Sequence, residues 1–186
     1  MKKSVKISLF IALLLVIDQI IKILVKTNMH LGQSIHIFSW FQIYFIENNG
    51  MAFGMSFGSK TILTLFRLIV SGLVLYYIIL LIKDNYKTSY LICVSLIFAG
   101  AIGNIIDCLF YGVIFVESAF LNGRVVDMFY FPLFTFPDRL PLLGGEIFFS
   151  PVFNFADSCI TVGIFTLLIF FRKDFNLTFD RYFSRK

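Results

Sequence analysis

Four aspartates stand in or beside apolar stretches of the chain, where a carboxylate is costly. Asp18, Asp107 and Asp157 fall within or at the ends of segments long enough to cross a membrane, and Asp127 lies among the apolar neighbours of residues 123–129. A charged Asp or Lys near the centre of a bilayer costs about 2.5–3.5 kcal/mol on insertion scales. Acids kept at such positions are therefore candidates for function.

Asp127 and Asp157 form the pair best suited to acid–base chemistry. Two carboxylates in a partly dry site can share one proton, because desolvation and mutual repulsion raise one pKa and leave one acid and one base. Such a pair activates water for amide hydrolysis without a metal or a covalent nucleophile. His30 and His36 lie far from any suitable Ser or Cys motif, and there is no HExxH sequence. These residues alone leave three classes open: an aspartyl hydrolase, a proton- or ion-coupled carrier, and a purely structural membrane protein.

The sequence predicts no metal site. Cys93, Cys108 and Cys159 are odd in number, form no CxxC pair and lie in or beside apolar segments, which is typical of small buried hydrophobic residues. The two histidines have no nearby cluster of acids or cysteines.

The elements that must position these acids follow from composition. Of the 186 residues, 59% are hydrophobic and 15% are charged, against about 25% charged in soluble domains. Four apolar segments each have the length of a spanning helix, which predicts an all-α membrane protein with one domain over residues 1–186. The predicted spans are residues 5–25, 61–82, 89–110 and 151–171.

Basic residues give the orientation. Ten of the 16 Lys and Arg flank the spans on one side, which the positive-inside rule makes cytoplasmic, so both termini are expected there. This also explains the net charge of +5 without a nucleic-acid partner. The first span lacks a small-residue cleavage site and is expected to be retained. The ten residues are Lys2, Lys3, Lys6, Lys83, Lys87, Arg172, Lys173, Arg181, Arg185 and Lys186.

Two outer segments, residues 26–60 and 111–150, are then long for mere connections. Partial alternation predicts short strands at 35–37 and 41–45. The second segment, rich in Phe, Pro and Gly, is expected to lie over the outer membrane face as a loop or interfacial segment.

This orientation puts the unusual polar groups at one membrane level, the outer leaflet. Asp157 is expected six residues into the fourth span, about 9 Å along a helix. Asp18 and Lys22 are spaced for a helical ion pair, and Arg67 is expected to extend outward along its helix to the membrane surface. A carrier predicts polar residues spread through the membrane depth, so the clustering favours a hydrolase.

Five motifs together resemble those of the lipoprotein signal peptidases (signal peptidase II). All five occur in the family's order, and the resemblance runs from about residue 10 to 172. The motifs are Asp18-Gln-Ile-Ile-Lys22, Asn48-Asn-Gly50-Met-Ala-Phe-Gly54, Gly103-Asn104-Ile-Ile-Asp107, Val125-Val-Asp127-Met-Phe129 and Phe153-Asn154-Phe-Ala-Asp157.

The resemblance implies an intramembrane aspartyl endopeptidase without a cofactor, in the bacterial cytoplasmic membrane. The family cleaves prolipoproteins just before a diacylglyceryl-modified Cys and is inhibited by globomycin. Its fold is four transmembrane helices with a small extracytoplasmic β-cradle and a short interfacial helix. Asp127 and Asp157 would be the catalytic pair. The residues that would position them or the substrate, or support the site, are Asp18, Lys22, Asn48, Gly50, Gly103, Asn104, Asp107 and Asn154.

The sequence departs from the family pattern in two places. Cys108 stands where the family has an arginine, and Arg124 or Arg139 could substitute for it. Residues 131–149 resemble an insertion, which could form a lid over the site or a lipid-contacting flap.

Overall fold

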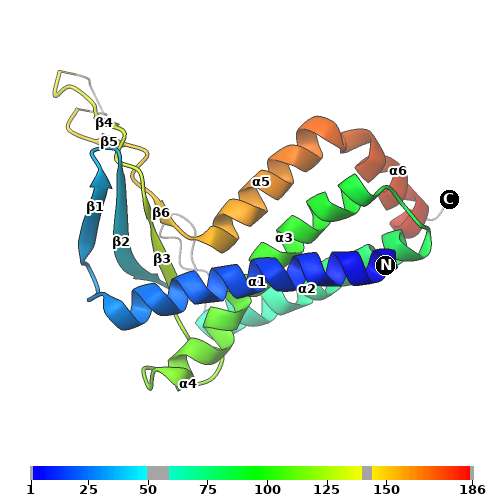
Figure 1. Ribbon diagram of the computed structural model, residues 1–186, viewed down its shortest axis with the longest axis horizontal. Coiled ribbons are helices and arrows are strands. Elements are labelled where there is room, and N and C mark those ends of the chain that lie inside the picture. Colours follow the sequence, from blue (N-terminus) through cyan, green and yellow to red (C-terminus); the bar gives the residue numbers. More distant parts are fainter. Residues whose placement is uncertain (1, 50–58, 140–143, 185–186) are drawn as a thin grey trace.

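The fold, described here from a computed structural model, is a bundle of helices with a small sheet at one end (Figure 1). The structure describes residues 2–49, 59–139 and 144–184. Both chain ends lie at the end of the bundle away from the sheet (Figure 1). The helices are α1 (Lys3–Asn28), α2 (Lys60–Lys83), α3 (Thr88–Ile106), α4 (Gly112–Ile114), α5 (Phe155–Phe170) and α6 (Arg172–Phe183).

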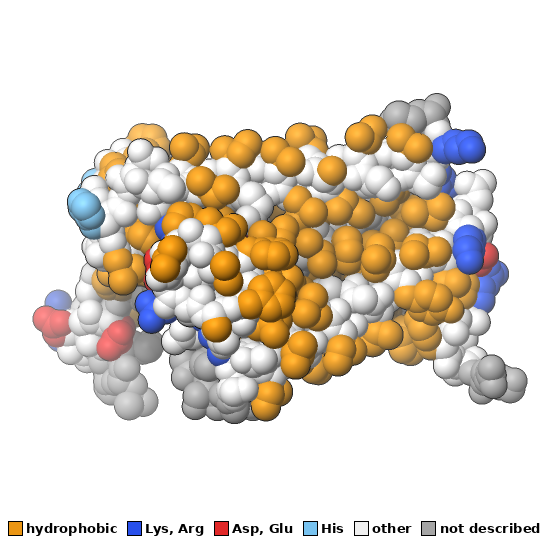
Figure 2. All heavy atoms as spheres, turned by 90° about the horizontal axis from the view of Figure 1, so that it is seen from below, with side chains coloured by type: hydrophobic (Ala, Val, Ile, Leu, Met, Phe, Trp, Pro, Cys, Tyr) orange, Lys and Arg blue, Asp and Glu red, His pale blue; other side chains and the backbone are white. Residues whose placement is uncertain are grey.

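The predicted spans are confirmed in part. Helices α1 and α2, together with the continuous stretch Thr88–Ile114, are each long and apolar enough to cross a membrane. The pair α5 and α6 meets this criterion jointly but is bent by 93°, so the described residues hold three candidate spans, or four if this bent pair is counted as one span. Hydrophobic side chains cover the middle of the molecule and charged ones gather at its two ends (Figure 2), as a lipid-facing surface requires.

The fourth span is shorter than predicted. Val152–Phe153 form strand β6, and α5 begins after Asn154, so the helix starts four residues later than residue 151. Asp157 consequently lies in the first turn of α5, and its expected position six residues into the helix is wrong. Hydropathy could not mark this boundary, because Val152 and Phe153 are as apolar as the helix that follows.

The two outer segments, together with the first residues of the predicted fourth span, form a four-stranded antiparallel sheet in the order β1-β2-β3-β6. Strands β1 and β2 confirm the two short strands predicted at 35–37 and 41–45. The second outer segment, expected to be a loop or interfacial segment, holds more regular structure, since it continues α3 to Ile114 and contributes β3, β4 and β5. Within the possible insertion, β4 and β5 pair as a hairpin. The strands are β1 (Ser34–Phe38), β2 (Phe41–Asn48), β3 (Val125–Tyr130), β4 (Phe134–Thr135), β5 (Ile147–Phe148) and β6 (Val152–Phe153).

Helix α3 is the centre of the bundle and packs against α1, α2 and α5. Its contact with α5 depends on glycines. A Cβ atom at Gly100 would lie 2.3 Å from the carbonyl oxygen of Ala156, and one at Gly163 would lie 2.6 Å from the Ile97 side chain. Such close approach is typical of helix pairs in membranes, where small residues allow extensive van der Waals contact.

Gly103 is where this packing meets the polar residues. A Cβ there would lie 2.6 Å from Asp18 Oδ2 and 3.1 Å from Ala156 Cβ. We expect Gly103→Ala to lower the free energy of unfolding by about 1–3 kcal/mol, because the added methyl group must displace packed neighbours. Gly72→Ala in α2 is the matched control, since nothing lies within 4 Å of its Cβ position. Thermal unfolding in one detergent should show a loss of stability for Gly103→Ala only; equal effects would contradict this account of the helix packing.

Candidate active site

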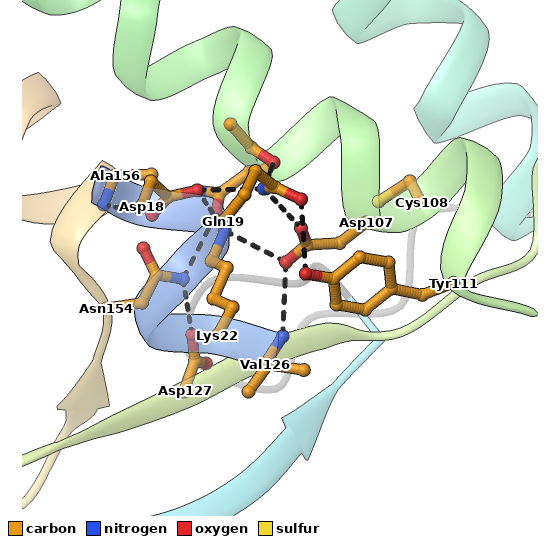
Figure 3. A network of polar contacts seen from close by, with 12 residues as sticks. Asp18, Gln19, Lys22, Asp107, Cys108, Tyr111, Val126, Asp127, Asn154 and Ala156 are labelled. Atoms are coloured by element: carbon orange, nitrogen blue, oxygen red, sulfur yellow. Dashed lines mark hydrogen bonds and ion pairs between the residues drawn. The ribbon is translucent and has the colours of Figure 1, made fainter. Parts of the chain in front are cut away.

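A fully buried lysine lies at the centre of the polar residues (Figure 3). Lys22 Nζ lies 3.0 Å from Asp18 Oδ2 and 2.9 Å from Asp107 Oδ2, and it donates to Asn104 Oδ1 at 2.9 Å. These three contacts use all three donors of the ammonium group. The predicted Asp18–Lys22 pair is thus confirmed and extends from α1 to α3.

The two carboxylates beside Lys22 hold other parts of the chain. Asp18 Oδ1 accepts a hydrogen bond from the backbone N–H of Ala156, in the first turn of α5, at 2.9 Å. Asp107 Oδ2 accepts from the backbone N–H of Val126, in β3, at 3.3 Å. The cluster on α1 and α3 therefore fixes the two segments that carry Asp157 and Asp127.

Gln19 and Tyr111 complete the cluster and had no assigned role in the sequence. Gln19 Nε2 donates to Asp18 Oδ2 at 3.0 Å and Asp107 Oδ1 at 3.1 Å, and the Tyr111 hydroxyl donates to Gln19 Oε1 at 3.1 Å. Gln19 belongs to the first of the five motifs, so its position in the sequence could have indicated a role in the site. Tyr111 ends a π-helical turn that begins at Asp107, and such turns, frequent at functional sites, are not visible in a sequence pattern.

Asp127 lies on β3, paired with Ile46 of β2 and only 1% exposed. Its Oδ1 accepts from Asn154 Nδ2 at 2.7 Å, and its Oδ2 accepts from Asn48 Nδ2 at 3.2 Å. Burial, reinforced by the negative charge of Asp157, raises the pKa of Asp127 to about 7. The Asp127 carboxyl can therefore hold a proton near neutral pH.

Asp157 is held by the start of α5. Asn154 is the N-cap residue, and it forms a capping box with Asp157: Asp157 N–H donates to Asn154 Oδ1 at 2.9 Å, and Asn154 N–H donates to Asp157 Oδ2 at 3.2 Å. Asn104 Nδ2 donates to Asp157 Oδ1 at 2.7 Å. Asp157 is half-buried, so its carboxylate is the more accessible of the pair.

Asn154 and Asn104 connect the two aspartates to the Lys22 cluster by hydrogen bonds. Asn154 Nδ2 donates to both Asp127 Oδ1 and Asn104 Oδ1, the latter at 3.0 Å, while Asn104 also accepts from Lys22. The structure thus brings together every described residue predicted for the site, and Gly50 lies outside the described residues. The residues brought together are Asp18, Lys22, Asn48, Gly103, Asn104, Asp107, Asp127, Asn154 and Asp157.

The Cys108 thiol contacts a guanidinium group, but the group belongs to Arg67 and not to Arg124 or Arg139. Arg67 Nη1, from α2, lies 3.6 Å from Cys108 Sγ, so the expectation that Arg67 extends outward to the membrane surface is wrong. Arg124 instead pairs with Glu47 at 3.1 Å, and Arg139 is exposed. The inward direction of Arg67 follows from the helix face that packs on α3, which hydropathy does not record.

Within the described parts of the chain, no three His, Cys, Asp or Glu side chains are grouped so as to hold a metal ion. The space between Asp18 and Asp107 is occupied by the Lys22 ammonium. Asp127 and Asp157, held by amides, thus lie beside a buried cluster of one ammonium and two carboxylates.

Residues 10–173 match the family described as signal peptidase (SPase) II. A lipoprotein signal peptidase of Porphyromonas gingivalis is 50% identical over 91% of this chain and 84% of its own length. One of Staphylococcus haemolyticus is 36% identical over 95% of this chain and 98% of its own length. A bacterial membrane enzyme solved by the in meso method at 1.9 Å resolution has 30% sequence identity and a TM-score of 0.67, covering 91% of this chain and 94% of that one.

Removing the Lys22 ammonium should be strongly destabilising. Lys22→Met leaves Asp18 and Asp107 buried without their cation, which we expect to cost about 3–5 kcal/mol of unfolding free energy. Lys87→Met is the control, because the Lys87 side chain is 64% exposed in its ion pair with Asp174, and its loss should cost less than about 1 kcal/mol. Thermal unfolding of the two variants in detergent measures the difference; comparable losses would contradict the central role of Lys22.

Proposed function

The chain belongs to the signal peptidase II family, and we propose that it is an intramembrane aspartyl endopeptidase in which Asp127 and Asp157 carry the reaction. Family membership and the named relatives indicate a protease that processes lipoprotein signal peptides. The observation that supports the catalytic assignment is the convergence of the two carboxyls on Asn154, one deeply buried and one accessible.

The two carboxyls have different tasks in this proposal. Asp157, ionised, takes a proton from a water molecule as the water oxygen attacks the scissile carbonyl carbon. Asp127, protonated, donates a hydrogen bond and then its proton to the carbonyl oxygen. When the C–N bond breaks, the proton held by Asp157 passes to the departing nitrogen, and the hydroxyl proton returns to Asp127. The raised pKa of Asp127 supports its role as the acid.

The substrate in this proposal is a prolipoprotein that carries diacylglycerol on a Cys, with cleavage just before that Cys. The lipid and the apolar signal peptide enter laterally from the bilayer, and a globomycin-type inhibitor would occupy the same space. No cofactor is invoked. Placement of the acids near the membrane surface suits this substrate, because water must reach the amide while the acyl chains stay in lipid.

The proposed location is the bacterial inner membrane, with both termini cytoplasmic, four crossings and the site near the outer face. Both chain ends lie at one end of the bundle, with the sheet at the other (Figure 1). A proton-coupled carrier would place its acids in sequence along the membrane depth. Asp18, Asp107 and Asp127 instead gather around one lysine and one asparagine at the sheet end of the helices.

Either catalytic aspartate should be essential. We expect Asp127→Asn and Asp157→Asn each to lower the cleavage rate by on the order of 10³-fold or more, because neither amide side chain can transfer the required proton. Both variants should fold nearly as the unchanged protein does. The assay is a gel shift of a diacylglyceryl-modified prolipoprotein in detergent micelles, with Asp180→Asn, an exposed acid on α6, as the control. Substantial turnover by either variant would refute the assignment.

The proton on Asp127 also predicts a pH dependence. Its pKa of about 7 lies above the ordinary range, so the acid is protonated at pH 6 and ionised at pH 8. We therefore expect kcat/KM to fall above pH 7, approaching tenfold per pH unit, and to recover when the enzyme returns to pH 6. The measurement is kcat/KM between pH 5.5 and 9 in an uncharged detergent. A rate that stays level or rises through pH 9 would show that Asp127 does not act as the acid.

A further inference from the structure

The last helix turns sharply away from the bundle. Helices α5 and α6 meet at an angle of 93°, and α6 lies at the end of the molecule that holds both termini (Figure 1). The family match ends at residue 173, so almost all of α6, Arg172–Phe183, lies beyond it. The sequence had predicted only a basic segment here, following the fourth span.

Helix α6 is docked rather than loosely attached. The hydroxyls of Thr178 and Tyr77 are hydrogen-bonded. Asp174 Oδ1 accepts from the Tyr86 hydroxyl and from Lys87 Nζ, both at 2.8 Å. These contacts hold α6 across the ends of α2 and α3 and fix its rotation about its own axis.

A third contact continues the Asp174 side of α6 toward its end, because Arg181 follows Asp174 by seven residues, about two helical turns. Asp84 Oδ2 accepts from the Tyr182 hydroxyl at 2.6 Å and from Arg181 Nη1 at 3.2 Å. Asp84 is the first residue after α2, in the turn to α3. The side of α6 that carries Arg181 therefore points toward the tip of this turn, away from the apolar body.

The opposite side of α6 carries a row of aromatic rings. Phe175, Phe179 and Phe183 follow one another at helical spacing, with ring centroids 5.6 Å and 5.2 Å apart. The Phe183 ring also contacts Tyr77 at 6.1 Å, and Tyr77 lies six residues before the end of α2, about 9 Å back along the helix. This side therefore faces the apolar body, yet Phe179 is still 46% exposed and Phe183 44%.

We propose that α6 lies flat in the membrane surface at this end, with Phe179 and Phe183 among the acyl chains of the adjacent leaflet. The partner is membrane phospholipid. The exposed rings continue the hydrophobic surface of the spans, and exposed Arg172 and Lys173 stand at the bend, where phosphate headgroups would meet them. The proposal goes beyond the catalytic assignment and does not depend on it.

One consequence concerns the depth of the active site. Helix α5 has 16 residues, about 24 Å at 1.5 Å per residue, which is shorter than the roughly 30 Å of a hydrocarbon core. With α6 in one surface, Asp157 stands at most about 21 Å above it and so remains below the opposite boundary. Helix α6 would thereby set how deep in the outer leaflet Asp157 lies.

Leu177 provides a matched control for the lipid contact. It is 58% exposed, more than either phenylalanine, but it precedes Arg181 by four residues and so lies on the Arg181 side of α6. If exposure alone decided which side chains contact lipid, Leu177 would contact lipid to at least the same degree as Phe179. The proposed orientation predicts that Leu177 faces water.

The experiment uses depth-sensitive quenching in proteoliposomes. Trp40, the single tryptophan, is first replaced by Phe, and Phe179→Trp, Phe183→Trp or Leu177→Trp is then introduced in the full-length protein. The vesicles contain phosphatidylcholine brominated near the headgroup end of its acyl chains. We expect bromine quenching of Phe179→Trp and Phe183→Trp to be at least twofold stronger than that of Leu177→Trp, and acrylamide to quench Leu177→Trp more strongly.

Two results would overturn the proposal. Equal bromine quenching at positions 177 and 179 would refute the orientation of α6. Absence of bromine quenching at both phenylalanine positions, with protection from acrylamide, would show that another protein surface or a second copy covers them. Because two phenylalanine positions are tested separately, a folding defect in one variant does not prevent a decision. Prolipoprotein cleavage by the same preparations tests the catalytic proposal separately.

Discussion

The buried ammonium of Lys22 is the constraint on which the rest of the structure depends. A cation at this depth is tolerated only when its charge and its three donors are satisfied, and Asp18, Asp107 and Asn104 together do this. Those partners come from α1 and from α3 with the π-helical turn that follows it, so the two helices must approach closely, and Gly103 leaves room for the approach. The same two carboxylates use their remaining acceptor positions on the backbones of β3 and α5. One buried charge thus determines where four elements meet.

The charges of this cluster also bear on the pKa of Asp127. Two carboxylates already surround the single ammonium, so little positive charge remains to keep Asp127 ionised, and Lys22 lowers the pKa of Asp127 less than Asn154 and Asn48 do. Asp127 is instead held by the neutral amides of Asn154 and Asn48. Amides orient a carboxyl without supplying a full charge, so burial and the repulsion from Asp157 prevail. A cationic donor in place of either amide would favour loss of the Asp127 proton.

The sequence supported the predictions that depend on local patterns. Hydrophobic runs predicted α1, α2 and α3, i,i+4 spacing predicted the Asp18–Lys22 pair, and alternation predicted β1 and β2. What it missed depends on contacts between distant residues. Strand β3 is defined by pairing with β2, more than 70 residues earlier in the chain by register, and its buried sequence does not alternate. The inward direction of Arg67 and the bend before α6 depend on which helix faces pack together. Residue composition does not predict which faces these are.

The position of Asp157 follows from how the chain enters α5. Strand β6 runs antiparallel to β3, with Phe153 opposite Phe129, so the chain leaves the sheet beside Asp127 and must begin a helix at once. An N-cap is needed there, since the first N–H groups of a helix lack partners within the helix. Asn154 fills that role through its side-chain oxygen, which leaves its Nδ2 hydrogens free to reach Asp127 and Asn104. The N-cap residue of α5, Asn154, therefore also connects the two aspartates. The capping box places Asp157 in the first turn of α5, where its side chain is only half-buried, while Asp127 on β3 is fully buried. The difference in accessibility between the two carboxyls thus arises from helix capping at the edge of a sheet.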